Sequence, residues 1–236
     1  KGLAQTQAEM DAHLANVSQS NFASQWGAGD IMFADLNGDK EINGGSGILG
    51  DTGDRKIIGN STPRYRFSLD LGGDYKGFDF RVLLQGVAKR DYMPNGPYFW
   101  GAQNMWQSAG FTTHMDYFRD ENSVMVQAGQ ADVNLDAYFP KPYFNTTKNQ
   151  QTQTRYLQNA AYMRLKNIQF GYTLPKELTT KIGISKARVY VSGDNLLTFT
   201  NLIDTFDPET VGLSGWNDGK TYPLAKVVSC GLSVTF

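Results

Sequence analysis

Hydrophobic and polar residues alternate along five stretches of the chain, and this alternation is its clearest signal. Successive side chains of a β-strand point to opposite faces, so a period of two residues predicts strands with one apolar and one polar face. The stretches that show this period lie at residues 64–73, 78–85, 163–172, 186–198 and 227–236. They predict an all-β, antiparallel fold.

The first two stretches are joined by four residues, 74–77, and predict a β-hairpin. The first strand places Tyr65, Phe67, Leu69 and Leu71 on one face and Arg66, Ser68, Asp70 and Gly72 on the other. In the third stretch the alternation changes parity between Leu165 and Ile168. That change predicts either a register break or the point at which the strand leaves its apolar surroundings.

The connections between the predicted strands are of two kinds. Two are short, at residues 74–77 and 173–185, and three are long, at 27–62, about 90–159 and about 201–225. If the strands alternate in direction, all short connections fall at one end of the sheet and all long ones at the other. A transmembrane β-barrel has short periplasmic turns and long extracellular loops, whereas a soluble sandwich gives no reason for such sorting. Five strands cannot close a barrel, so we interpret the chain as a segment of a larger one.

Composition agrees with this fold and removes several functional classes. The chain has 14 Phe, 12 Tyr and 25 Gly among 236 residues, which favours β structure. Its 22 basic and 23 acidic residues leave a net charge of −1, so it lacks the basic excess that nucleic acids attract. A single cysteine, Cys230, excludes an internal disulfide framework. No stretch approaches the roughly 18 apolar residues of a transmembrane helix, and residues 1–25 lack the apolar region of a signal peptide.

One loop carries oxygen ligands at the spacing of an EF-hand calcium loop. In "ADLNGDKEINGG" (residues 34–45) the first five ligand positions of that motif are filled, with Glu41 contributing its backbone carbonyl. Lys40 replaces the usual Gly at position 6 and Ser46 replaces the Glu at position 12, so a later residue, Asp51 or Asp54, would complete the set. The predicted Ca²⁺ ligands are Asp35, Asn37, Asp39, Glu41, Asn43 and Asp54. The alternative is a turn-rich loop without metal, because Asp, Asn and Gly are ordinary turn residues.

The long connection between the second and third strands is rich in aromatic residues. Aromatic side chains suit sugar stacking and protein hot spots alike, and we single out Tyr98, Trp100 and Trp106 as candidate contacts with a ligand or partner. The alternative is that the aromatic residues form the small core of the connection itself. No arrangement of Ser, His or carboxylates typical of catalysis is visible, so we do not expect an enzyme.

Several segments, taken in order, resemble one known family. They are "GDIMFADLNGDKEIN" (residues 29–43), "GDRKIIGNSTPRYRFSLDL" (53–71), "YKGFDFRVLLQGVA" (75–88), "AYMRLKNIQFGYTLP" (161–175), "RVYVSGDNLLTFT" (188–200) and the terminal "GLSVTF". Together they resemble the C-terminal barrel region of SusC/RagA-type TonB-dependent outer-membrane transporters. Related transporters usually read DxNGDG in the Asp/Asn loop and place an Asp at the twelfth position, which this chain shifts by inserting residues 44–50.

The resemblance implies a 22-stranded barrel in the outer membrane, of which this chain would supply about the last five strands. A plug domain and the remaining strands would lie outside the sequence. Residues 1–62 would form an extracellular loop region that contains the Asp/Asn loop, and residues 63–236 the strands with their long loops. The apolar strand faces would contact lipid, and the charged faces, with Arg66, Asp70, Asp79, Arg81, Arg188 and Asp194, would face the plug.

The implied function is import of glycans or peptides under a SusD-type lipoprotein lid. The TonB complex would supply energy through the N-terminal part of the transporter. The main alternative is a soluble, calcium-dependent carbohydrate-binding β-domain, which would also have aromatic loops and an Asp/Asn loop. The two hypotheses differ in the strands, because the barrel requires an apolar face toward lipid and a soluble domain would expose polar residues on its outer strands.

Overall fold

The structure is a computed structural model that describes residues 1–103, 106, 108, 110–212 and 219–236. The chain divides into two compact units. Unit 1 contains Lys1–Gly59, Pro94–Leu157 and Gly215–Gly219, and unit 2 contains Asn60–Met93, Gln158–Ser214 and Lys220–Phe236. The chain first passes from unit 1 to unit 2 between Gly59 and Asn60, near the predicted boundary at residue 62. The prediction placed the long connection after the second strand with the strands, whereas most of it belongs to unit 1.

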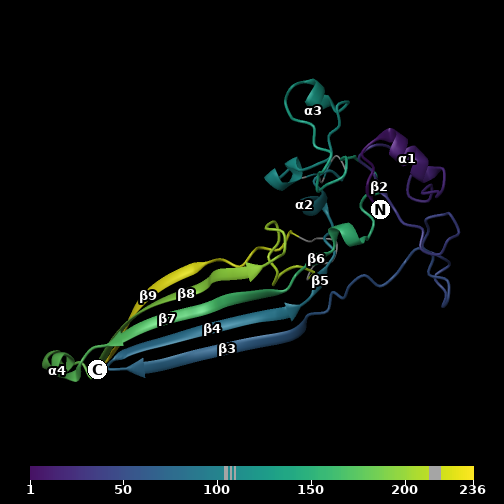
Figure 1. The fold of residues 1–236 in the computed structure, drawn as a ribbon. Helices are drawn as coiled ribbons and strands as arrows, with labels where there is room; N and C mark the ends of the chain where they lie inside the picture. The colour runs from purple at the N-terminus through teal and green to yellow at the C-terminus, as the bar shows by residue number, and fades with distance from the viewer. Residues whose placement is uncertain (104–105, 107, 109, 213–218) are drawn as a thin grey trace. The chain divides into compact units, whose positions relative to one another are not determined.

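Unit 2 is built on a five-stranded antiparallel sheet (Figure 1). Its strands are β3 (Arg64–Tyr75), β4 (Phe78–Lys89), β7 (Tyr162–Thr173), β8 (Lys186–Thr200) and β9 (Val227–Thr235). Their order in the sheet is their order in the chain, and every neighbouring pair is antiparallel. A separate short pair joins β5 (Asp91–Tyr92) to β6 (Gln158–Asn159). The predicted all-β, antiparallel fold is confirmed.

The turn between β3 and β4 is shorter than predicted. It consists of Lys76 and Gly77, whose φ angles of 49° and 87° are both positive. Two-residue hairpin turns of type I′ require this conformation, and Gly adopts it without steric cost. The predicted four-residue turn at 74–77 is therefore wrong by two residues, since β3 continues to Tyr75, which pairs with Phe78.

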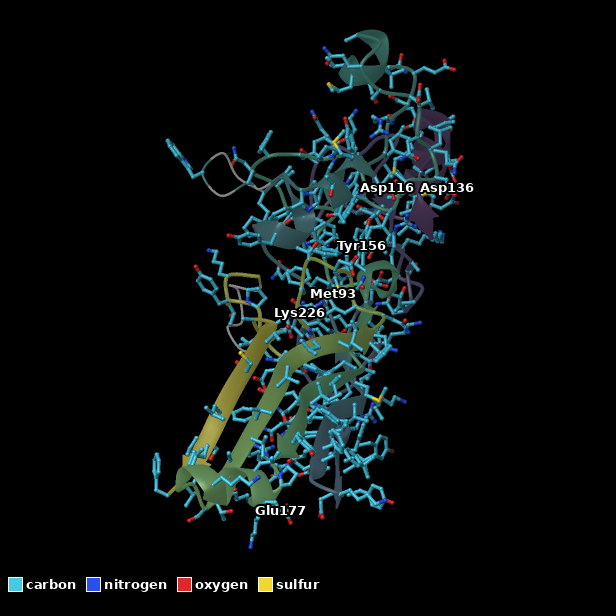
Figure 2. All side chains as sticks on the ribbon, turned by 90° about the vertical axis from the view of Figure 1, so that its left-hand side faces the viewer. Met93, Asp116, Asp136, Tyr156, Glu177 and Lys226 are labelled. Atoms are coloured by element: carbon cyan, nitrogen blue, oxygen red, sulfur yellow. The ribbon has the colours of Figure 1, made fainter. Side chains whose placement is uncertain are left out.

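The second short connection, between β7 and β8, contains α4 (Lys176–Thr179) and the 3₁₀ turn η3 (Thr180–Ile182). It lies at the same end of the sheet as the β3–β4 turn (Figure 1). Figure 2 shows Glu177 of α4 at this end and Lys226, just before β9, at the opposite end. Short and long connections are thus sorted between the two ends of the sheet, as the sequence predicts.

The parity change in the third predicted strand is a β-bulge at Lys166. Leu84 pairs with Leu165 and Leu83 pairs with Asn167, so Lys166 has no partner residue on β4. The register between β7 and β8 shifts at the same point. Because the bulge adds one residue, odd-numbered side chains before it and even-numbered side chains after it point to the same face. The apolar residues before and after the bulge therefore lie on the same face of the sheet, and the register break is the correct interpretation.

One face of the sheet is apolar and exposed. Leu71, Val82 and Ile168 are paired in register across β3, β4 and β7 and represent this face. Many of its large side chains are between 36% and 73% exposed, namely Phe67, Leu69, Leu71, Phe78, Phe80, Met163, Ile168, Phe170, Val189, Val191, Leu197, Phe199, Val228 and Leu232. This is the face that the sequence predicts to be apolar.

The opposite face carries charges that pair across strands. Asp70 on β3 and Arg81 on β4 form an ion pair with a distance of 2.5 Å between Oδ2 and Nη2. Arg188 on β8 reaches across β7 to Asp79 on β4, where Nη2 and Oδ1 are also 2.5 Å apart. Both pairs come from the predicted charged face.

The ion pair between Arg188 and Asp79, which spans the intervening strand β7, depends on a glycine. Gly171 on β7 lies in register with Asp79, directly under the path of the Arg188 side chain. A Cβ atom at Gly171 would lie 2.6 Å from Asp79 Oδ2 and 2.8 Å from Arg188 Cζ, which is closer than Cβ atoms come to other heavy atoms. The missing side chain therefore leaves the space through which Arg188 reaches its partner.

Unit 1 consists of short elements around small cores. They are β1 (Gly2–Leu3), α1 (Gln7–Leu14), β2 (Ile31–Met32), α2 (Pro97–Trp100), η1 (Thr112–Met115), α3 (Val124–Gln127) and η2 (Thr154–Tyr156). Thr6 precedes helix α1 and caps it, because its hydroxyl accepts a hydrogen bond from Glu9 N. Its apolar side packs Met10 against Ala4 and Met32. Within the described residues, no helix has the length and apolar character needed to cross a membrane.

Replacing Gly171 by Ala is expected to destabilise the sheet by about 1–3 kcal/mol, because the added Cβ must displace a partner of the Asp79–Arg188 pair. Gly72→Ala is the matched control, since Gly72 lies on the same face and a Cβ there would meet its nearest atom, Phe80 O, at 3.4 Å. The midpoint of thermal unfolding of the full-length protein measures the effect. Equal midpoints for the two variants would contradict the role given to Gly171.

Candidate functional site

The Asp/Asn loop is held in its turn by hydrogen bonds from its own backbone. Asp35 accepts from Gly38 N at 2.6 Å and from Lys40 N at 2.9 Å. Lys40 has a φ of 65°, in the left-handed region that favours glycine. It occupies the position that is Gly in an EF-hand. Lys40 therefore has a positive φ at the position where the motif has glycine.

The middle of the loop is organised around Asp39. Asn37 Nδ2 donates to Asp39 Oδ2 at 2.8 Å, and Glu41 N donates to Asp39 Oδ1 at 2.8 Å. The hydrogen bond from Asn37, followed by the one from Glu41, holds the pKa of Asp39 below its ordinary value of 3.8. The Glu41 carboxylate accepts from Asn21 Nδ2 at 3.1 Å, and its backbone carbonyl accepts from Asn43 Nδ2 at 3.3 Å. Asp39 is thus ionised at neutral pH in the centre of the loop.

Asp54 joins the two ends of the loop. Its Oδ1 accepts from Leu36 N at 2.6 Å and its Oδ2 from Asn43 N at 2.9 Å. Asp51, the other residue considered for the last ligand position, accepts instead from Ser46 N at 2.9 Å. Of the two, Asp54 is the residue that the structure brings to the other predicted ligands.

The predicted Ca²⁺ ligands lie in one segment of the chain. They combine carboxylate oxygens with amide and backbone carbonyl oxygens. In the part of the chain that the structure describes, no three His, Cys, Asp or Glu side chains gather so that they could hold a metal ion by themselves. An oxygen-only set of this kind suits a hard cation such as Ca²⁺ rather than a transition metal. The calcium site remains a prediction.

Aromatic residues from separate parts of the long connection form a core of unit 1. Phe99, Trp100, Phe139 and Tyr156 are each at most 7% exposed. The rings of Trp100 and Tyr156 meet edge to face with centroids 4.8 Å apart, and those of Phe99 and Trp100 at 4.9 Å. Burial raises the pKa of the Tyr156 hydroxyl. The aromatic residues of this connection therefore do form a core of their own, and Trp100 is part of it.

The three predicted contact residues do not share one environment. Trp100 is buried, Tyr98 is half-buried and stacks on Phe111 with ring centroids 5.7 Å apart, and Trp106 is 93% exposed. A single aromatic platform built from all three is therefore not what the structure shows. Contact of each residue with a ligand or partner stays a prediction.

A buried ion pair, which sequence reasoning missed, joins the N-terminal segment to the long connection. Lys148 Nζ lies 2.7 Å from Asp30 Oδ2, and the two side chains are only 7% and 0% exposed. Asn149 Nδ2 donates to Asp30 Oδ1 at 2.8 Å, and Lys148 Nζ lies 4.0 Å from the centre of the Tyr143 ring. Burial, with the negative charge of Asp30, raises the pKa of Tyr143. The charged partners are 118 residues apart, so no local pattern signals them.

A pocket of about 440 Å³ lies beside this ion pair, within unit 1. Its apolar wall is formed by Trp100, Tyr117, Phe139, Pro140, Pro142, Tyr143 and Phe144, and polar side chains in its lining include His114, Lys148, Asn149 and Gln150. Among the three predicted contact residues, Trp100 is the one that lines the pocket.

Unit 2 has a buried charge cluster of its own around Arg164, on the charged face of the sheet. The Arg164 side chain is 3% exposed and binds Asp207 at 2.7 Å and Glu209 at 2.9 Å. Its Nε donates to Thr198 Oγ1 at 2.9 Å, and the bulge residue Lys166 pairs with Glu209 at 3.1 Å. The cluster ties the connection after β8 to β7. Sequence reasoning missed it because the acidic partners lie 43 and 45 residues after Arg164 in the chain.

The chain is similar in sequence to TonB-dependent receptors of Formosa agariphila. It shares 30% identity with receptor P3 over 221 residues, which covers 88% of this chain and 19% of that receptor. With receptor P39 it shares 26% identity over 245 residues, which covers 95% of this chain and 20% of that receptor. The chain thus spans about a fifth of the length of these relatives. No protein-family model matches it.

Solved structures agree with the sequence relatives. A structure of the RagAB peptide transporter matches with a TM-score of 0.54 and 24% identity, over 79% of this chain and 18% of that one. The RagAB peptide importer in its open-open state matches with a TM-score of 0.50 and 25% identity over the same shares. Sequence and fold together confirm the resemblance of this chain to the SusC/RagA-type TonB-dependent transporters.

Proposed function

We propose that this chain supplies five wall strands of an outer-membrane β-barrel that imports glycans or peptides, energised by the TonB complex and covered by a SusD-type lipoprotein. The observation that carries this proposal is the sheet of unit 2, with an exposed apolar face and an ion-paired opposite face. A soluble protein rarely exposes so continuous an apolar surface, whereas the wall of a barrel requires one toward lipid.

The edges of the sheet support a larger barrel. In the described residues, β3 pairs only with β4, and β9 pairs only with β8. Unpaired backbone N–H and C=O groups cost several kcal/mol each in lipid, and exposed strand edges promote aggregation in water. Further strands of the same transporter on both sides would satisfy these groups. A barrel of 22 strands, as the resemblance implies, would enclose the plug on its charged face.

The same features weigh against the soluble alternative. A soluble, calcium-dependent carbohydrate-binding domain would cover or replace the apolar face, and 14 large apolar side chains on that face are at least 36% exposed. The matched RagAB structures are named as a peptide transporter and importer, which supports a transport function and favours peptides as one substrate class. A non-enzymatic role follows from this function.

We extend the proposal to calcium in the Asp/Asn loop. Asp35, Asn37, Asp39, Asn43 and Asp54 would contribute side-chain oxygens and Glu41 its backbone carbonyl. Support comes from Asp54, which contacts both ends of the loop, and from the EF-hand-like turn at Lys40. Bound calcium would stiffen this extracellular loop.

Leu69→Arg should impair assembly of the full-length protein in the outer membrane, because a charge on the lipid face costs about 2–4 kcal/mol near the bilayer midplane. Leu69 lies on the apolar face, paired with Leu84. Ser68→Arg, on the neighbouring position of the charged face, is the matched control and should assemble. The amount of folded, heat-modifiable protein in outer-membrane fractions measures the effect. Normal assembly of Leu69→Arg would count against the lipid-facing assignment.

Transport itself is tested in cells. Cells that lack the full-length transporter should fail to accumulate fluorescently labelled oligosaccharides or peptides that the parent strain takes up. Loss of TonB, or dissipation of the proton-motive force, should abolish the same uptake. Uptake that persists without TonB would refute an energised importer. Loss of uptake on removal of the lipoprotein alone would support the proposed lid.

Calcium binding is tested by titrating CaCl₂ into the full-length protein in a calorimeter. Asp39→Asn is expected to lower the affinity at least about tenfold, because it removes a charge from the ligand set. Asp51→Asn is the matched control, since Asp51 belongs to the same exposed segment but hydrogen-bonds Ser46 instead of the predicted ligands. Equal affinity of both variants, or no calcium binding by the parent protein, would show that the loop is a metal-free turn.

A further inference from the structure

Three basic residues lie together at one end of the charged face of the large sheet. Arg64 is the first residue of β3 and Lys89 is the last residue of β4, and the two lie directly opposite each other in the register. Arg66 follows two residues along β3 and therefore lies on the same face. This end of β3 and β4 is the end opposite α4 (Figure 1). We call Arg64, Arg66 and Lys89 the basic patch.

The basic patch is not neutralised by a neighbouring acid. Like charges that lie directly opposite each other on adjacent strands repel, which destabilises the strand pair. Among the residues that the structure describes, no Asp or Glu forms an ion pair with a member of the basic patch. Asp91, the acid nearest to Lys89 along the chain, accepts instead from Asn60 N at 2.9 Å. Three positive charges thus lie close together without a paired carboxylate in this part of the chain.

Four other cations of the charged face are paired with acids. Arg81, Arg188 and Arg164 each bind a carboxylate at 2.5–2.7 Å. The bulge residue Lys166 binds Glu209 at 3.1 Å. The sheet therefore places acids beside these cations, and the basic patch departs from that pattern.

The basic patch is also accessible and chemically suited to an anion. Arg66 and Lys89 are exposed and Arg64 is half-buried. A guanidinium group presents its N–H groups as a planar fork that matches the two oxygens of a carboxylate, and an ammonium group adds a flexible point charge. A ligand with carboxylate groups would bind these cations and remove the repulsion between them.

We propose that the basic patch binds the carboxylate groups of an acidic substrate inside the transporter. The inference rests on the proposed function, which places the charged face inside the barrel, and it narrows the substrates to those that carry negative charge. Side chains that face the lumen of a barrel tune its selectivity, and Arg or Lys residues in a pore select anions. Positive charge along a confined passage also raises the local concentration of anions.

The first test asks whether the positive charge is free before a substrate binds. Lys89→Gln relieves the repulsion with Arg64, so the midpoint of thermal unfolding of the full-length transporter should stay unchanged or rise. Arg81→Gln is the comparison, because it breaks the ion pair with Asp70 and should lower the midpoint. An equal fall for Lys89→Gln would show that an acid of the plug or of a neighbouring strand already pairs with the basic patch, and would overturn the proposal.

The second test measures binding to the full-length transporter, purified in detergent and without TonB. The acidic probes are trigalacturonate and triaspartate, and the neutral probes of similar length are maltotriose and triglycine. Calorimetric titration at low ionic strength should show saturable binding of an acidic probe that weakens as NaCl is added. The acidic probe that binds distinguishes an acidic oligosaccharide from an acidic peptide. Failure of both acidic probes to bind would overturn the proposal.

A charge-matched control separates the basic patch from the rest of the face. The double variant Arg66→Gln, Lys89→Gln should weaken the acidic probe at least about tenfold, because two charge-assisted contacts are lost. Lys186→Gln is the control, since Lys186 is exposed, begins β8 at the other end of the sheet and has no ion pair among the described residues. It should leave the affinity unchanged. Binding that the double variant does not weaken would place the acidic probe elsewhere and overturn the proposal.

The outcomes separate this inference from the importer hypothesis. Binding is measured without TonB, so failed uptake in cells together with binding that depends on the basic patch would refute the importer and leave the basic patch in place. TonB-dependent uptake of neutral oligomers alone, without binding of either acidic probe, would overturn the basic patch and leave the importer in place.

Discussion

Pairing of main-chain N–H and C=O groups between neighbouring antiparallel strands is the constraint on which the rest of the structure depends. Because β3, β4, β7, β8 and β9 are paired in register, the alternate side chains that share a face on one strand lie beside those of the same face on its neighbours. The bulge at Lys166 keeps this assignment where the sequence changes parity. Without it, Met163 and Leu165 would join the charged face, and the apolar surface proposed to meet lipid would be interrupted.

The charged face is cross-linked by ion pairs that reach across strands. Arg188 passes over Gly171 to Asp79 and thereby links β8 to β4 across the intervening strand. Arg164 is buried and pairs with acidic residues of the connection after β8, so that the connection is fastened to the sheet. A buried guanidinium is stable only when its charge is matched. The sheet and the connection after β8 are therefore joined on this face by ion pairs.

In unit 1 the polar groups serve mainly to hold irregular backbone. Asp54 closes the Asp/Asn loop, and Asp30 gathers Lys148 and Asn149 from the long connection. Loops without long strands or helices need such side-chain partners for their backbone groups.

The sequence by itself determined the five strands, their two faces and the sorting of the connections, because each follows from the two-residue period of the strands. At the change of parity after Leu165 it left two alternatives, and the structure decided for a register break. It also determined the spacing of oxygen ligands from Asp35 to Asn43. Only the tertiary structure decided that the hairpin turn has two residues, that Trp100 is buried in a core, and that Asp30 meets Lys148 across 118 residues. These features depend on which distant segments approach one another, and no local pattern of residues encodes that approach.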